Sequence, residues 1–397
     1  MLKDYINIKY LLYGGAIVFT RGFELLVLFF AAHLLTKEDY GQLEYYKKVI
    51  EVGASFLAFG FPDLIMGYTR SEDSKKYFYI LALIFVLILS SFALPVLYYY
   101  NLLFLLIPLL FYAIFFNGSI TQNYLLVKLG SNRVAVYKML VSVLFYGIVA
   151  WLVYRYHVKA MAFVYPSYFL IIPYTLIIFL LLKRQQIVWQ KLAKYGRLFY
   201  RLLASSFTLV VSNFANLMFL YTDIFIIKMF SEHANVQIAN YSFSLNIANA
   251  LMLIPLTLVQ ADVEKLKASN KEIPVLFKKI LILVLIAMFF LIVFYKLLIT
   301  YAFERYADTF ILFLIILLAK FFQALSPLFG AYLTILRKFT PNLIVNIGAL
   351  LFNIVLSYIL FYSNGVYGVA AASFISLSLR FIVLVILVKR SVVNTKK

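Results

Sequence analysis

The sequence predicts an all-α integral membrane protein. Of its 397 residues, 65% are hydrophobic and only 13% are charged, whereas soluble domains carry roughly 25% charged residues. Apolar stretches of about 20 residues, the length a helix needs to cross the hydrocarbon core, recur along the whole chain. Together these observations exclude a soluble globular domain.

Twelve such stretches predict twelve transmembrane helices. The first six cover residues 10–35, 43–68, 77–99, 102–127, 134–154 and 160–182, and the second six cover 202–229, 236–261, 278–299, 307–335, 341–362 and 366–388. Only one gap between them is long enough to separate domains. We therefore expect a first lobe at 1–182, a linker at 183–201 and a second lobe at 202–397.

The basic residues predict the orientation. The net charge is +20. On the side of the membrane that holds the N-terminus, the ends of the spans carry 25 Lys and Arg, and on the opposite side they carry 8. Because basic residues are enriched in cytoplasmic loops, both termini are expected in the cytoplasm. A nucleic-acid partner is not expected, since that would require the charge to cluster on one soluble face. With no cysteine and three scattered histidines, we expect no metal site and no cofactor.

The two halves are related by a weak internal repeat. At a constant offset, Tyr124-Leu125 falls on Tyr332-Leu333 and residues 158–162 fall on residues 366–370. Six spans per half make the two repeats parallel, and such transporters place the substrate site at the repeat interface.

The linker predicts an amphipathic helix. Residues 183–201 carry six cations and no acid, and Val188, Leu192, Tyr195 and Phe199 recur at helical spacing. Such a helix lies on the membrane surface, here on the inner leaflet. A plain solvated linker is the alternative.

Three cations lie within apolar spans: Arg21, Lys320 and Arg380. A charge at the bilayer centre costs about 2.5–3.5 kcal/mol on insertion scales, so such residues usually face a cavity or a partner. We expect them to bind an anionic cargo. Lys320 and Arg380 have no acid within four residues, although Asp223, Asp63 or Glu24 on another helix could balance them.

Acids do lie near the cations of the first lobe. Arg21 and Glu24 are three residues apart, and Lys47 and Glu51 are four apart, spacings that place each pair on one helix face. Both pairs could be internal ion pairs. In the alternative interpretation, Arg21 and Lys47 contact an anionic headgroup while Glu24 holds Arg21 or binds a coupling cation.

Polar stripes are more prominent in the second lobe, and they supply further candidates for a central cavity. Each stripe could also stabilise helix packing, because interhelical hydrogen bonds contribute about 0.6 kcal/mol on average. The candidate substrate ligands from these stripes are Asn213, Asn216, Gln323 and Asn346, and Asp223 is a candidate for a coupling ion.

Three segments carry a resemblance to a known superfamily. They are the run RGFELLVLFFAAHLLTKEDYG at 21–41, the residues DIFIIKMF at 223–230 followed by ANYS at 239–242, and GVYGVAAA at 365–372. They resemble polysaccharide-exporting flippases of the multidrug/oligosaccharidyl-lipid/polysaccharide (MOP) superfamily. Arg21 matches the arginine of their first helix, whereas His33 stands where an arginine is common.

The resemblance implies two six-helix lobes that form a V around a cationic cavity. It also implies an O-antigen-type flippase of the bacterial cytoplasmic (inner) membrane. Such a protein moves an undecaprenyl-pyrophosphate-linked oligosaccharide to the outer leaflet by alternating access, for cell-surface polysaccharide biosynthesis. We expect a monomer, with a polysaccharide polymerase or glycosyltransferases as partners. Coupling to Na⁺ or H⁺ through Glu24 or Asp223 is left open.

Two other functions compete with this interpretation. A MATE-like exporter of drugs or organic cations, in the same superfamily, predicts negative charge in the cavity, whereas the charges within these spans are mostly positive. A membrane glycosyltransferase predicts a long extramembrane loop, and no outer gap here is long enough to hold one. An enzyme is therefore not expected.

Overall fold

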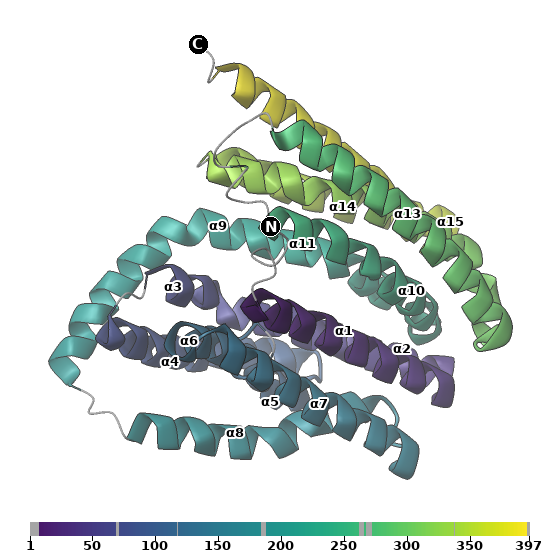
Figure 1. Cartoon of the computed structure of the whole chain (residues 1–397). Helices are drawn as coiled ribbons and strands as arrows, with labels where there is room; N and C mark the ends of the chain where they lie inside the picture. The colour runs from purple at the N-terminus through teal and green to yellow at the C-terminus, as the bar shows by residue number, and fades with distance from the viewer. Residues whose placement is uncertain are drawn as a thin grey trace. The chain divides into compact units, whose positions relative to one another are not determined.

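The structure is a computed structural model that describes residues 8–68, 71–116, 118–183, 188–261, 266, 272–336 and 338–394 (Figure 1). In these ranges all the regular secondary structure is helical. The chain divides into two compact units, residues 1–210 and 211–397. Each unit is described separately.

The described residues of the first unit form eight α-helices and the beginning of a ninth. They are α1 (Ile8–Leu34), α2 (Lys37–Ala58), α3 (Phe61–Tyr68), α4 (Glu72–Tyr99), α5 (Leu106–Ile114), α6 (Ile120–Leu129), α7 (Ser131–Tyr156), α8 (Tyr165–Lys183) and α9 (Trp189–Phe230), with short 3₁₀ turns η1 (Leu103–Leu105) and η2 (Ala160–Phe163). Helix α1 packs against α7, and α2 packs against α5. The core is rich in stacked aromatic rings, among them Tyr112 on Phe116 at 4.1 Å between centroids.

The second unit is organised around α14 (Phe310–Ile335), which packs against helices on several sides. Its neighbours are α10 (Ala234–Ala248), α11 (Leu253–Ala261), α13 (Glu272–Tyr301) and α15 (Phe339–Asn394), with 3₁₀ turns η3 (Asn249–Met252) and η4 (Glu304–Thr309) beside them. A central apolar helix with neighbours on several sides explains why α14 is largely buried along its length.

The expected spans and the observed helices agree in part. Seven of the described helices are long and apolar enough to cross a membrane, or eight if α9, which bends by 55° between Val210–Phe219 and Tyr221–Phe230, is included. One of the seven, Phe339–Arg390, covers two expected spans. The expected spans 43–68, 102–127 and 236–261 are each divided into shorter helices. The protein is thus a multi-pass membrane protein, and twelve separate crossings remain a prediction.

The first of these divisions has a local cause. Helix α2 begins at an N-cap, where the Thr36 hydroxyl accepts the Asp39 N–H at 3.1 Å. It ends where Phe59 and Gly60 take left-handed backbone conformations, with φ of 35° and 74°. Two such residues interrupt the helical hydrogen bonds, so α3 starts in a new direction.

The expected linker is continuous with the next span. Residues 184–187 lie outside the described residues, and residues 189–201 form the first turns of α9, which runs on without a break into the expected seventh span. The boundary between the two units therefore falls inside a helix, close to the expected start of the second lobe at residue 202.

Helix α15 contains two helical arms joined at Gly365, whose φ of 55° and ψ of −132° are not helical. A glycine adopts this conformation without the penalty that a Cβ atom imposes. Just beyond the turn, the Gly368 backbone lies against the Leu360 carbonyl, so closely that a Cβ at position 368 would overlap the carbonyl oxygen. The arms thus meet through a backbone contact that only glycine permits.

We expect Gly368→Ala to destabilise the second unit, because the added methyl group has backbone rather than a flexible side chain in its way. Overpacking of this kind costs about 1–3 kcal/mol. Thermal unfolding of the detergent-solubilised protein would measure the loss. Gly348→Ala is the matched control, since a Cβ there meets no atom within 4 Å and alanine gains up to about 1 kcal/mol of helix propensity. Equal midpoints for the two variants would contradict the tight contact.

Candidate functional site

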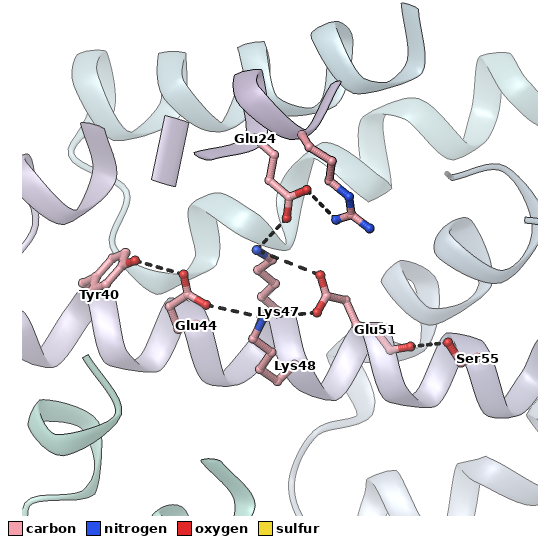
Figure 2. A network of polar contacts seen from close by, with 8 residues as sticks. Glu24, Tyr40, Glu44, Lys47, Lys48, Glu51 and Ser55 are labelled. Atoms are coloured by element: carbon pink, nitrogen blue, oxygen red, sulfur yellow. Dashed lines mark hydrogen bonds and ion pairs between the residues drawn. The ribbon is translucent and has the colours of Figure 1, made fainter. Parts of the chain in front are cut away.

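A network of charged side chains joins α1 to α2 in the first unit (Figure 2). The Lys47 ammonium lies 2.7 Å from one carboxylate oxygen of Glu24, and Arg21 donates to the other oxygen at 2.9 Å. Lys47 also lies 3.9 Å from Glu51, so one lysine ties both helices together. Farther along α2, Lys48 bonds Glu51 at 3.3 Å and lies 4.0 Å from Glu44. Finally, Tyr40 donates to Glu44 at 3.0 Å.

The network is buried and electrically balanced. Its cations are Arg21, Lys47 and Lys48, and its acids are Glu24, Glu44 and Glu51. Both lysine side chains are nearly inaccessible, at 3% and 4% exposure, whereas the Arg21 side chain keeps 60% of its surface exposed. Because the desolvation of an ion costs several kcal/mol even after relaxation, the buried members depend on one another. Arg21 is the member that presents charge at the surface of the unit.

The two ion pairs expected from spacing are both present, at 2.9 Å for Arg21 with Glu24 and 3.9 Å for Lys47 with Glu51. The shortest contact of Lys47, with Glu24 on the other helix, was not predicted. Lys48 and Glu44 were also missed as members of this network, although the spacing of 44, 48 and 51 along α2 places them on one face. Lys47 is therefore occupied by two carboxylates.

A second polar cluster surrounds Asp223 of α9 in the second unit. The carboxylate accepts hydrogen bonds from Ser373 at 2.7 Å and Asn353 at 3.2 Å, which lie on opposite arms of α15. The Tyr241 hydroxyl of α10 donates to it as well. Lys320 of α14 acts on the carboxylate electrostatically. Asp223 thereby holds four helical segments together.

Three hydroxyl groups near this cluster lack a hydrogen-bond partner among the described residues. Ser357 lies one turn from Asn353, Ser376 follows Ser373 by three residues, and Ser242 is next to Tyr241; all three side chains are completely buried. Orphan hydroxyl groups are rare in protein interiors. Each of them is an uncommitted oxygen on a helix that also contributes a partner of Asp223.

Arg380 is a buried cation whose described polar contact is with a neutral side chain. It lies on the second arm of α15 with 8% of its surface exposed, and its Nε donates to Asn346 at 3.0 Å. Asn346 in turn donates to Ser212 at 2.8 Å. Within the described part of the chain no carboxylate lies within 4.0 Å of Arg380, and its terminal N–H groups have no hydrogen-bond partner. Such a guanidinium can bind an anion in a bidentate manner.

The remaining predicted ligands differ in burial and in their contacts. Lys320 donates to Gln323 at 2.8 Å, and both residues are buried on α14. Asn216 is exposed on α9, whereas the side chain of Asn213 lies outside the described residues, as does that of Asp63. A single cavity lined by residues of both units stays a prediction.

Solved structures resemble this chain over nearly its whole length. A lipid II flippase MurJ in an inward closed conformation matches with a TM-score of 0.62, 16% sequence identity and coverage of 96% of this chain and 87% of that chain. An outward-facing multidrug resistance transporter of the MATE family and MOP superfamily matches at 0.58, 15% identity and coverage of 98% and 96%. A MATE protein in a straight conformation matches at 0.57, 16% identity and coverage of 97% and 94%.

The chain shares its fold with these solved structures. Neither a family model nor a curated protein sequence matches the chain, and identity this low carries the fold alone. The MOP resemblance inferred from residues 21–41, 223–242 and 365–372 agrees with these structures in fold. The polysaccharide-exporting branch within MOP remains a prediction.

Neutralising Glu24 should destabilise the MOP fold strongly, because Glu24→Gln leaves Lys47 buried with only its longer contact to Glu51. Breaking a buried pair from one side costs about 3–5 kcal/mol. The double variant Glu24→Gln/Lys47→Met should recover much of the loss, as read from thermal unfolding in detergent. Asp73→Asn removes the exposed pair with Lys191, whose side chains are about half exposed, and should change stability by less than about 1 kcal/mol. If the double variant loses as much stability as Glu24→Gln and Lys47→Met lose in sum, the two residues are not coupled and the prediction is contradicted.

Proposed function

We propose that the protein flips an undecaprenyl-pyrophosphate-linked oligosaccharide from the inner to the outer leaflet of the bacterial cytoplasmic membrane. The observation that carries the proposal is Arg380, a buried guanidinium without a carboxylate among its described neighbours, in a MOP fold. A buried cation of this kind is costly unless an anion approaches it. A pyrophosphate group meets that need, since its oxygens accept the paired N–H donors of arginine.

The described contacts divide the candidate ligands into groups. We propose that Arg380, Lys320 and the exposed end of Arg21 contact the pyrophosphate. The sugars would be held by the polar side chains of Asn213, Asn216, Gln323 and Asn346. Some of these side chains would instead orient the cations, as Asn346 orients Arg380 through a hydrogen bond of 3.0 Å. Lys47 pairs with two carboxylates, so it would position Glu24 and not touch the cargo.

Transport would proceed by alternating access, with the lipid tail remaining in the membrane while the headgroup crosses. No covalent step is required, and the neighbouring solved structures are transporters. We propose that the protein works as a monomer beside the glycosyltransferases or the polymerase that make and use the glycan. Coupling to Na⁺ or H⁺ would use Asp223 with its surrounding oxygens, or Glu24.

A MATE-like exporter of organic cations is the second candidate. Two observations favour it: similarity to MATE structures at TM-scores of 0.58 and 0.57, and the buried carboxylates Asp223 and Glu24. Against it, Glu24 already balances two cations in the first unit, and Asp223 is occupied by three donors. A bulky organic cation would have to displace these partners, whereas a proton or a small ion need not displace all of them.

Arg380→Ala and Lys320→Ala should each abolish surface-polysaccharide export in a flippase-null strain. Loss of a hydrogen bond to a charged group costs about 1.5–3 kcal/mol, roughly a 10- to 100-fold loss of affinity. Surface glycan would be quantified beside membrane levels of each variant. Lys389→Ala, which removes an exposed cation from the same helix α15, is the matched control. Normal export by both variants would reject the anion site, and loss of resistance to cationic dyes instead would favour the MATE-like function.

Asp223→Asn should remove ion coupling while preserving the fold. The amide is nearly isosteric, and Tyr241 and Ser373 can rotate their hydroxyl groups to accept as well as donate. Flipping into proteoliposomes is expected to fall at least about tenfold and to lose its response to Na⁺ and pH gradients. Asp308→Asn, at an exposed acid of the same unit, should respond as the wild type does. An unchanged gradient response in Asp223→Asn would exclude this carboxylate as the coupling site.

A further inference from the structure

The first three turns of α9 form a helix with three chemically different faces. One face packs on the preceding helices of the same unit, where Tyr195 stacks on Tyr77 of α4 with 5.2 Å between ring centroids. One turn later, Phe199 stacks on Phe61 at 5.0 Å and meets Phe78 edge-on at 5.4 Å. Tyr195 and Phe199 of the apolar face therefore pack against protein, where lipid chains cannot reach the buried Phe199.

Polar contacts fix the same face in place. The Val188 N–H donates to the Tyr77 hydroxyl at 3.0 Å, and Lys191 donates to Asp73 at 2.6 Å. Lys191 is thus committed to an ion pair within the first unit. The segment is docked along its length, and its rotation about the helix axis is set.

The second face is cationic. Lys194, Arg197 and Arg201 are spaced three and four residues apart, so they lie along one side of the helix. All three are exposed, and none forms an ion pair with a described residue. From residue 183 to 201 the sequence contains no acid that could neutralise them.

The third face is aromatic. Trp189 is 78% exposed and Tyr200 is 73% exposed. Their spacing of eleven residues brings them back to nearly the same side of the helix, about three turns apart. This aromatic stripe lies beside the cationic face and away from Tyr195 and Phe199.

We propose that the cationic and aromatic faces of residues 189–201 bind the headgroups of anionic phospholipids. The proposal goes beyond the transport function and does not depend on the cargo. Tryptophan and tyrosine prefer the membrane–water interface, and basic side chains near an anionic leaflet attract its headgroups. Because α9 continues directly into an apolar segment, Arg201 lies at the membrane boundary. A lipid headgroup layer therefore fits this surface better than a soluble acidic protein does.

The chain offers a direct probe, because it contains only two tryptophans. Trp151→Phe leaves Trp189 as the single tryptophan, which can be excited selectively at wavelengths where tyrosine does not absorb. The variant would be placed in nanodiscs of equimolar phosphatidylglycerol and phosphatidylcholine, with one lipid or the other brominated. We expect brominated phosphatidylglycerol to quench Trp189 more strongly, with a preference of about fivefold for each basic side chain that engages a headgroup.

Replacing Lys194, Arg197 and Arg201 with Gln in this background should reduce the preference to about one. The matched control replaces Lys278, Lys279 and Lys389 with Gln, which removes the same charge from exposed positions of α13 and α15, and should keep the preference. Equal quenching by the two lipids in the starting variant would overturn the proposal. So would a preference that survives the triple change at 194, 197 and 201. Equal quenching together with loss of export by that triple variant would indicate a protein partner instead.

Discussion

The cost of placing charge in an apolar interior governs this structure. An isolated ion at the bilayer centre costs several kcal/mol, and the protein contains many charged side chains within or beside its apolar helices. Each unit resolves the problem differently. The first unit balances three cations with three acids on α1 and α2. The second unit surrounds the carboxylate of Asp223 with neutral donors from α10 and both arms of α15, with Lys320 nearby.

These two solutions have different consequences for helix packing. In the network of the first unit, three of the described ion pairs lie within α2, and the pair of Lys47 with Glu24 joins α2 to α1. In the second unit Asp223 bonds residues from three other helical segments, so the position of the carboxylate depends on all of them. The Gly365 turn matters here because it brings Asn353 and Ser373 to the same carboxylate. A shift of either arm of α15 would alter the coordination of Asp223, which makes this cluster sensitive to conformation.

Sequence alone predicted an all-α membrane protein and a fold that the solved structures share, and it gave the short-range ion pairs as one of two interpretations. Those features depend on composition and on spacing within one helix, both of which can be read directly. The contact between Lys47 and Glu24 could not be predicted, because it depends on how α1 and α2 cross. The division of residues 43–68 at Phe59 and Gly60 was missed for a related reason, since apolar length alone does not reveal two left-handed residues. The role of Asn216 stays a prediction, since its exposure on α9 is compatible with a residue that faces a cavity.

Under the proposed function, the balance of charge also links cargo to coupling. A pyrophosphate that approaches Arg21 competes with Glu24 for the same guanidinium, because Glu24 already accepts from it at 2.9 Å. Once Arg21 turns to the cargo, Glu24 retains Lys47, whose charge is shared with Glu51. The remaining members of the network, two lysines and three glutamates, would then carry one excess negative charge. In the second unit Arg380 has no such competitor among the described residues, so it can receive an anion without releasing a carboxylate.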